Sequence, residues 1–316
     1  MKISVDELLN EALKRGIDLE VICNHRLKEK LIEHPRIQKP GLALTGFTYH
    51  VYPERVQIFG ETEITYLNQL SPYKKRKAVK FLEEIPISCI IVTKGLNIPQ
   101  VLKRKACKEK IPLLRTSMQS STFIIQIEDL LAELLAEKVV IHGNLLDVFG
   151  VGVLIIGKSG IGKSELSLSL IMRNHRFVAD DMVEIIKKSP RVLIGRSTEL
   201  LKHIVEIRGL GIINIKDLFG ISSIRDTKRI ELVIELIRWE DETDYDRLGF
   251  EENYYEIMGV RVPLVRLPVT PGRQLPALIE VAARNYLLKL KGIDSAKEFK
   301  ENIDRALQGR FREEIE

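Results

Sequence analysis

The chain has 316 residues, 45% of them hydrophobic and 29% charged, which is the composition of an ordinary globular protein of about two domains. No apolar run approaches the roughly 20 residues that span a bilayer, and the opening segment MKISVDELLN carries acids where a secretion signal would be apolar, so we expect a cytoplasmic protein without a membrane segment. The net charge of +5 includes two basic runs, 74–77 and 103–110, but no nucleic-acid recognition motif accompanies them, so we expect solvated helix faces and no nucleic-acid partner.

The first 110–120 residues alternate short apolar runs with helical patterns. Ser4 and Glu7 form a capping box at the start of a helix. A second helix begins at Ser71-Pro72, with a serine N-cap and a proline at its first position. Strands are expected at 55–60, 88–93 and 112–116, and a further helix at 97–110. This order predicts a small parallel α/β domain, in which we find no catalytic constellation.

The three cysteines are Cys23, Cys89 and Cys107. Their number is odd, and their spacing is unlike that of metal ligands. We expect free thiols in a reducing compartment, with Cys23 and Cys89 in the core because they lie in predicted strands.

A polar stretch, 116–122, separates the first domain from a helix with leucines at 130, 131, 134 and 135. We place the boundary in this region, with an N-terminal α/β domain at 1–128 and a second domain at 129–316. The second domain opens with KVVIHGNLLDVFG, in which Gly143-Asn144 between two apolar runs predicts a tight hairpin.

The segment GKSGIGKS matches the phosphate-binding loop pattern G-x-x-x-x-G-K-[ST]. It consists of Gly157, Lys158, Ser159, Gly160, Ile161, Gly162, Lys163 and Ser164. Glycines let backbone N–H groups curl around phosphate oxygens, the lysine reaches the β- and γ-phosphates, and the serine hydroxyl binds Mg²⁺. The run VGVLII before the loop reads as a buried strand and ELSLSLIMRN after it as a helix, as the motif requires. The sequence therefore predicts a nucleotide-binding domain, and the loop by itself does not tell what is done with the nucleotide.

Asp180 and Asp181 end the next predicted strand, RFVADD. Because neighbouring parallel strands end on the same side of a sheet, these carboxylates should approach the γ-phosphate. One of them could take a proton from an attacking hydroxyl, as kinases require. A turn or helix-cap pair is the simpler alternative.

Four further features are weaker candidates from the residues alone. Glu206, in EIRGLGI, is a possible second Mg²⁺ ligand or a surface glutamate. Arg247 could stabilise a transferred phosphoryl group, although a loop arginine is usually only solvated. His142, beside the predicted hairpin turn, is more often structural than catalytic. The segment 268–273, PVTPGR, precedes a helix and forms a plausible second anion site.

Together these segments resemble the HPr kinase/phosphorylase family. The matching pieces, in order, are HGN, GKSGIGKSE, VADD, EIRGLGI, DRLG and PVTPGR. The resemblance covers the whole second domain, and KPGLALTGF in the first domain also looks like the family. It implies a kinase domain similar to that of phosphoenolpyruvate carboxykinases and a homohexamer.

The resemblance also implies the activity. Family members phosphorylate a serine of HPr, the phosphocarrier of the bacterial sugar phosphotransferase system, with ATP as the donor and pyrophosphate as the alternative donor, and so act in carbon catabolite repression. They also run phosphorolysis of seryl-phosphate by inorganic phosphate, which yields pyrophosphate. By motif, Lys163 contacts the β- and γ-phosphates, Ser164 and Glu206 hold Mg²⁺, and Asp181 is the base that takes the serine proton.

His142 and Arg247 complete the active site by the same resemblance, and 268–273 matters chiefly for phosphorolysis. Thr270 departs from the family, which usually has a basic residue there, so the balance of the two activities is open. A kinase of a small metabolite is the main alternative. A GTPase-like switch would need an N-K-x-D segment, and a DNA-binding regulator a helix-turn-helix pattern; we find neither in the sequence.

Overall fold

The computed structural model describes residues 2–239, 253–270 and 272–313. The chain divides into two compact units, Met1–Ala136 and Glu137–Glu316. The boundary that we placed after residue 128 falls inside helix α6 (Ser120–Leu134). The buried residues of α6 pack into the core of the first unit, so the whole helix belongs to that unit.

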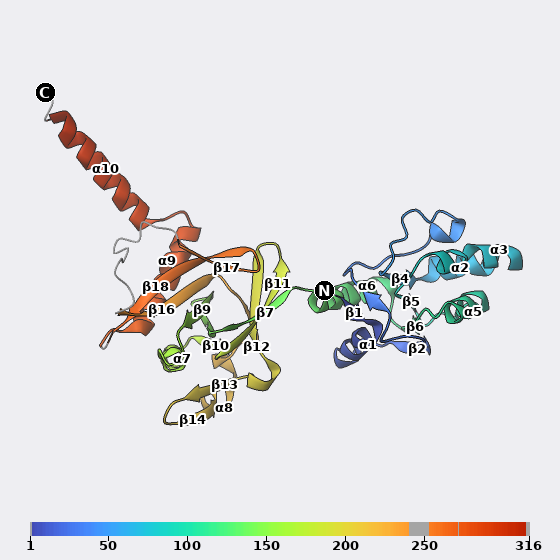
Figure 1. The fold of residues 1–316 in the computed structure, drawn as a ribbon, viewed down its shortest axis with the longest axis horizontal. Coiled ribbons are helices and arrows are strands. Elements are labelled where there is room, and N and C mark those ends of the chain that lie inside the picture. The colour runs from blue at the N-terminus through green and yellow to red at the C-terminus, as the bar shows by residue number, and fades with distance from the viewer. Residues whose placement is uncertain (1, 240–252, 271, 314–316) are drawn as a thin grey trace. The chain divides into compact units, whose positions relative to one another are not determined.

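The first unit is built on a four-stranded sheet, in the order β2-β6-β5-β4 (Figure 1). The strands are β2 (Glu20–Cys23), β4 (Val56–Phe59), β5 (Cys89–Val92) and β6 (Leu113–Arg115). The strands β4, β5 and β6 are parallel, as predicted, while β2 is antiparallel to β6. A two-residue pair, β1 (Ile3–Ser4) and β3 (Leu31–Ile32), lies beside it.

Helices cover both faces of this sheet because successive residues of its strands are apolar, so that both faces carry buried side chains. Helices α1 (Val5–Lys14) and α6 pack on the face that carries Val56, Ile58 and Ile91. The remaining helices pack on the face that carries Phe59, Ile90 and Val92. These are α2 (Glu61–Gln69), α3 (Pro72–Ala78), α4 (Phe81–Glu84) and α5 (Gln100–Lys108), with the 3₁₀ helix η1 (Ala43–Thr45).

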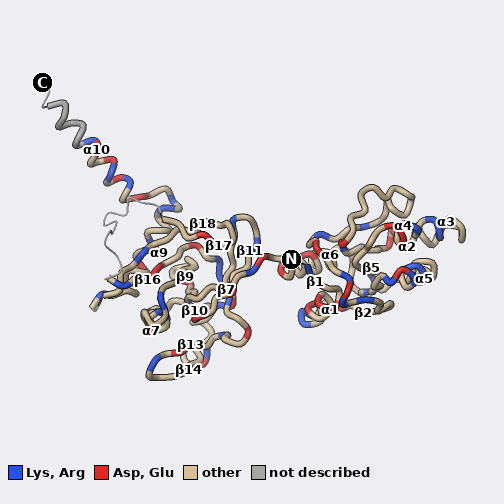
Figure 2. Tube along the Cα trace, in the orientation of Figure 1, with Lys and Arg blue, Asp and Glu red and all other residues tan. Residues whose placement is uncertain are grey.

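The predicted helix starts are confirmed. At α1 the Glu7 amide donates to the Ser4 hydroxyl at 3.1 Å, and the Ser4 amide donates to the Glu7 carboxylate at 2.7 Å. Pro72 opens α3. The basic runs at 74–77 and 103–110 lie on α3 and at α5 (Figure 2), where most of their lysines and arginines are exposed to solvent.

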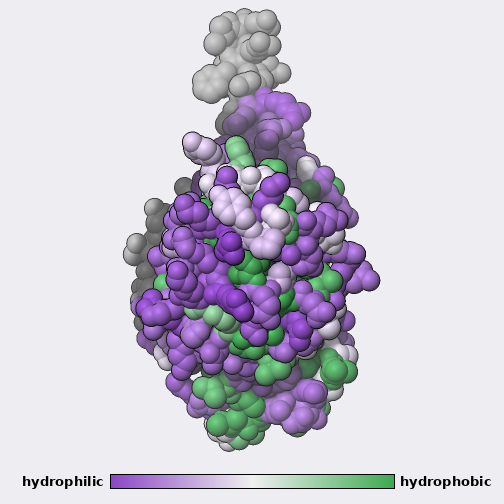
Figure 3. Space-filling view, turned by 90° about the vertical axis from the view of Figure 1, so that its right-hand side faces the viewer, coloured by the Kyte–Doolittle hydropathy of each residue, from purple (hydrophilic) through white to green (hydrophobic). Residues whose placement is uncertain are grey.

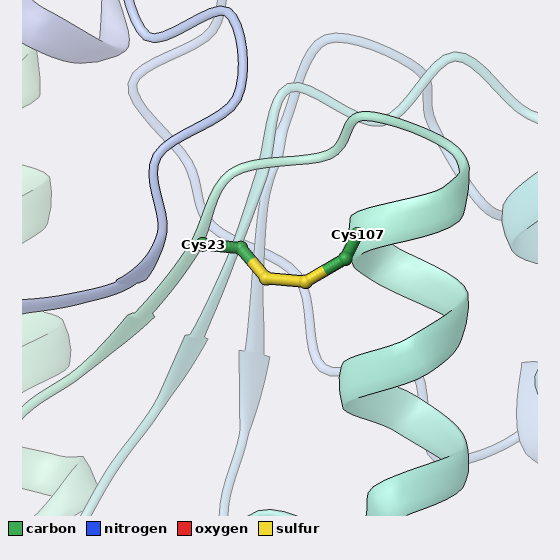
Figure 4. Close-up of a disulfide and its surroundings, with 2 residues drawn as sticks. All are labelled: Cys23 and Cys107. Carbon is green, nitrogen blue, oxygen red and sulfur yellow. A yellow bond between two sulfur atoms is a disulfide. The ribbon is translucent and has the colours of Figure 1, made fainter.

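The prediction of three free thiols is wrong for two of them. Cys23, at the end of β2, and Cys107, in α5, form a disulfide, with Cα atoms 6.0 Å apart (Figure 4). Eighty-four residues separate them in sequence, and only the packing of α5 beside β2 brings them together. Cys89 is free and buried in the core, and burial raises the pKa of its thiol to about 12.

The second unit contains a six-stranded sheet in the order β10-β8-β9-β16-β18-β17. Its strands are β8 (Asn144–Val148), β9 (Val151–Gly157), β10 (Arg176–Ala179), β16 (Leu232–Arg238), β17 (Tyr254–Ile257) and β18 (Val260–Val269). A second sheet, β15-β12-β11-β7, consists of β7 (Lys138–His142), β11 (Met182–Ser189), β12 (Val192–Ser197) and β15 (Thr227–Arg229). The strands β13 (Ile204–Ile207) and β14 (Gly211–Asn214) form a hairpin.

These elements make three layers. Helices α7 (Lys163–Met172) and α9 (Leu275–Leu290) pack on one face of the six-stranded sheet. The four-stranded sheet packs on its other face, against Leu145 and Leu154. The remaining helices are α8 (Ile215–Phe219), α10 (Ser295–Glu313), η2 (Glu199–Leu201) and η3 (Ile221–Ser223). Among the described helices, none has the length and apolar character of a membrane span.

The hairpin predicted at Gly143-Asn144 is wrong. The flanking strands belong to different sheets: β7 pairs with β11, whereas β8 pairs with β9 and β10. Gly143 lies where the chain passes from one sheet to the other. The backbone approaches closely there, because a Cβ on Gly143 would lie 2.7 Å from the Ile155 carbonyl oxygen. The tight turn lies instead between β8 and β9, where Phe149 and Gly150 both have positive φ.

Candidate active site

One edge of the six-stranded sheet gathers the predicted site residues. The strands β9, β16 and β18 are parallel, so the phosphate-binding loop and the segment 268–273 follow strand ends at the same edge. We expected the strand before Asp180 to lie next to β9, but β8 lies between them. Because β8 is antiparallel to both neighbours, β10 still runs in the direction of β9, and Asp180 reaches the same edge.

The phosphate-binding loop has the predicted strand–loop–helix context. It runs from Gly157, the last residue of β9, to Lys163, the first residue of α7. Gly157 permits a close approach to β16, because a Cβ there would lie 2.7 Å from the Leu236 carbonyl oxygen. The N-terminus of α7 supplies unpaired backbone amides and the positive end of the helix dipole. The loop is therefore built to bind an anion.

Lys163 turns back over this loop. Its Nζ donates to the carbonyl oxygens of Gly157 at 3.0 Å and Lys158 at 3.4 Å. Arg208 also lies at the loop, with guanidinium nitrogens 3.2 and 3.5 Å from the position of a Cβ built on Gly160. Two cationic side chains from different parts of the chain thus lie at the loop, where they can neutralise phosphate charge.

Asp180 is buried at the base of the site. Its carboxylate accepts hydrogen bonds from the Ser164 hydroxyl at 3.1 Å and from Asn144 Nδ2 at 2.5 Å, and also from the Glu206 backbone amide. Burial raises the pKa of this carboxyl to about 6, the hydrogen bonds from Ser164 and Glu206 oppose that rise, and the Asp181 charge adds to it. Among the described residues, no lysine, arginine or histidine forms an ion pair with Asp180.

Asp181, unlike the buried Asp180, is exposed to solvent. Its side chain is 69% exposed, and its Oδ1 lies 3.7 Å from His142 Nδ1. The residue has a left-handed φ of 61°, and its carbonyl accepts the Gly143 amide at 3.0 Å. A non-glycine residue in this conformation is strained by about 1–3 kcal/mol and is frequent at functional sites. The geometry thus leaves one carboxylate open to an incoming group and keeps the other inside.

The oxygen atoms at this edge suit Mg²⁺. The Ser164 hydroxyl, the Asp180 carboxylate and the exposed Glu206 side chain are hard oxygen ligands, and Ser164 and the Glu206 backbone both contact Asp180. The described residues contain no cluster of three or more histidine, cysteine or acidic side chains that could hold a metal. A metal here would therefore need phosphate and water oxygens as well, which is how proteins commonly bind Mg²⁺ with nucleotides.

The structure describes the segment 268–273 in part and does not describe Arg247. In 268–273, Arg273 Nη1 donates to the Pro268 carbonyl oxygen at 3.3 Å, and Gly272 has a left-handed φ of 81° before α9 begins. Arg247 lies in 240–252, outside the described residues.

Sequence reasoning overlooked two residues of this site. Asn144 was read only as a turn residue, yet it is fully buried and its Nδ2 also donates to the Ser167 hydroxyl at 2.8 Å. Arg208 was not singled out within its motif. A polar residue at the start of an apolar strand was the available signal for Asn144, since a buried amide must find partners.

Both units of the chain match models of one protein family. Residues 3–131 match the family model described as "HPr Serine kinase N terminus", and 133–303 match "HPr Serine kinase C-terminal domain". The chain belongs to the HPr kinase/phosphorylase family. The resemblance drawn from its motifs is thereby confirmed, and it extends over both units.

Individual relatives agree over nearly the whole chain. The HPr kinase/phosphorylase of Geobacter sulfurreducens is 50% identical over 303 residues, which cover 96% of this chain and 95% of the relative. That of Leptospira biflexa is 45% identical over 309 residues, covering 97% and 95%. Among solved structures, the Hpr(Ser) kinase/phosphatase from Coxiella burnetii is 38% identical, with a TM-score of 0.47, over 51% of this chain and 98% of that chain.

Proposed function

We propose that the protein phosphorylates a serine of HPr with ATP in the presence of Mg²⁺, and that it also runs phosphorolysis of the resulting seryl-phosphate. The observation that carries the proposal is the pair of unlike carboxylates beside a phosphate-binding loop. Asp180 is buried against Ser164, while Asp181 is open to solvent. Membership of a family whose relatives are named HPr kinase/phosphorylase supports HPr as the acceptor.

In the forward direction, residues 157–164 and the N-terminus of α7 hold the nucleotide phosphates, with Lys163 on the β- and γ-phosphates. Asp181 takes the proton of the serine hydroxyl. The serine oxygen bonds to the γ-phosphorus as the bond to the β–γ bridging oxygen breaks, and ADP leaves. His142, 3.7 Å from Asp181, holds the carboxylate in place. Mg²⁺, held by Ser164 and Glu206, would neutralise phosphate charge when bound.

In the reverse direction, an oxygen of inorganic phosphate bonds to the phosphorus of the seryl-phosphate. The bond from phosphorus to the serine oxygen breaks, Asp181 returns the proton to that oxygen, and pyrophosphate is released. Microscopic reversibility then makes pyrophosphate a possible phosphoryl donor in place of ATP. We assign the extra positive potential for the second anion to 268–273, and we assign Arg247, on its motif alone, to the transferred phosphoryl group.

We also propose that the protein forms a homohexamer in the cytoplasm, because the family resemblance implies one. Light scattering of the purified full chain tests the oligomer. A dominant species of any mass other than six chains would contradict it.

The activity is tested with purified full-length protein, HPr, Mg²⁺ and ATP, followed by mass analysis of HPr. We expect one phosphate on one serine, and loss of that phosphate with release of pyrophosphate when excess inorganic phosphate is added. Lys163→Met is the negative control, because its lysine neutralises charge that grows during transfer. Unlabelled HPr in the presence of an active enzyme would instead favour a kinase of a small metabolite.

A further inference from the structure

The β13–β14 hairpin and the segment after it have two unlike faces. Val205, Ile207 and Ile215 face inward and are buried in the core of the second unit. The outward side carries large apolar residues that are between 38% and 76% exposed. These residues, which we call the apolar rim, are Leu210, Ile212, Leu218, Phe219 and Ile221. Figure 3 shows hydrophobic residues, with polar ones among them, at the bottom of the view, at the height where Figure 1 draws β14 and α8.

The apolar rim begins next to Glu206, at the candidate active site. Ile212 is the register partner of Glu206 across the hairpin, so the two side chains project from the same face at neighbouring positions. The Glu206 amide in turn donates to Asp180. The hairpin therefore presents a candidate metal ligand and an exposed isoleucine side by side.

Exposed apolar residues that gather in this way indicate an interaction surface, whereas single exposed ones are ordinary. The exposure of Asp181 indicates what kind of partner binds to this surface. Its side chain is largely open to solvent, so the acceptor hydroxyl can arrive on the surface of a folded protein. A second copy of the chain packed on Ile212 would stand beside Glu206 and obstruct that approach.

We infer that the apolar rim is the docking surface for the protein substrate, and that it receives apolar side chains flanking the acceptor serine. The inference rests on the proposed function and adds to it the surface by which HPr is recognised. The rim selects a protein that displays a serine within an apolar patch, and it contributes to substrate affinity without touching the nucleotide.

The test compares the double variant Ile212→Ser/Leu218→Ser with a matched control, Val281→Ser on α9, whose valine is 62% exposed outside the rim. Initial rates are measured against HPr concentration, together with ATP affinity and molar mass by light scattering. We expect the KM for HPr to rise about tenfold in the double variant, which corresponds to about 1.4 kcal/mol of binding. ATP affinity and molar mass should match the wild type, and the control should match it throughout.

An unchanged KM for HPr would overturn the inference. A lowered kcat with an unchanged KM would also overturn it, because the hairpin would then act on the catalytic geometry. A change in molar mass would assign the rim to a second copy. If the double variant loses ATP binding through misfolding, Ile221→Ser alone should still raise the KM about threefold. A wild type that leaves HPr unphosphorylated would refute the proposed function itself, whereas normal wild-type activity with unaffected variants refutes only the docking surface.

Discussion

Acidic side chains have opposite environments at the two edges of the six-stranded sheet where its strands begin and end. At the edge with the phosphate-binding loop, Asp180 is buried and has no ion-pair partner among the described residues. At the other edge, the buried Asp147 pairs with Arg225 at 2.7 Å. There Glu280 on α9 also accepts two hydrogen bonds from Arg173, at 2.6 and 2.8 Å, and lies 2.9 Å from His175.

The pKa values follow this difference. Burial raises the pKa of Asp180 to about 6, whereas hydrogen bonds from Arg173 lower the pKa of Glu280 to about 2. Arg173 and His175 also line a cavity of about 560 Å³ at this second edge. A charge that the protein pairs with its own arginine stabilises the fold, whereas a buried carboxyl with a raised pKa and no ion-pair partner is typical of a functional site.

If this comparison holds, changes at the first edge should affect activity. Asp181→Asn should lower kcat for HPr phosphorylation by roughly 10²–10⁴-fold, the range for lost general acid–base groups, with ATP affinity and melting temperature nearly unchanged. Rates and ATP titrations on the same preparation check this. Asp180→Asn is the matched variant and should lower the rate less; the reverse ranking would exchange the roles of the two aspartates.

Asp180→Asn should also stabilise the fold at high pH. The native pKa of about 6 exceeds the ordinary 3.8, so ionisation of the buried carboxyl lowers native stability as pH rises from about 4 to about 6. The penalty above pH 6 amounts to roughly 3 kcal/mol at most. Thermal unfolding at pH 8 should therefore favour the variant by several degrees, with the advantage closing toward pH 4. An advantage independent of pH would contradict this account.

The opposite edge should respond in stability alone. Glu280→Ala removes charged hydrogen bonds to Arg173 and should cost about 1–3 kcal/mol at pH 7, with kcat and KM at 25 °C unchanged. Because the native pKa of Glu280 is depressed, its contribution is present above pH 4.5 and is lost as pH falls toward 2. Denaturant unfolding across pH measures it, with the exposed neighbour Arg176→Ala as control. A loss of activity without a loss of stability would erase the distinction between the edges.

The smallest expected effect separates the two directions of the reaction within the first edge. Phosphorolysis brings two separate anions together, so it needs more positive potential than ATP-dependent transfer. Arg273→Ala should lower phosphorolysis several-fold more than phosphorylation, mainly by raising the KM for phosphate, and Thr270→Arg should strengthen phosphorolysis. The measurement is the initial rate of phosphorylation and of phosphorolysis for each variant, the latter across a titration of phosphate. Equal losses in both directions for Arg273→Ala would make 268–273 a general part of the site.

Local sequence was sufficient where one segment supplies both the chemistry and its scaffold. The phosphate-binding loop is contiguous, its glycines and flanking periodicities are visible in the chain, and the structure has the same strand, loop and helix. The capping box at Ser4 and the three parallel strands of the first unit were predictable for the same reason. The family, too, followed from short motifs in order.

Two predictions failed because each depended on a partner distant in the chain. Gly143-Asn144 has the local signature of a hairpin, but the chain there passes from one sheet to another, and nothing within those two residues records that. The pairing of Cys23 with Cys107 depends in the same way on α5 lying beside β2.

The sequence by itself therefore determined the nucleotide loop, the carboxylate pair beside it and the family. Only the tertiary structure decided that Asp180 is buried while Asp181 is exposed, and that Asn144 holds the buried one. The physical reason is that strand order sets these relations. The antiparallel strand β8 lies between β9 and β10, and a carboxyl group's environment depends on which strands surround it rather than on its neighbours in the chain.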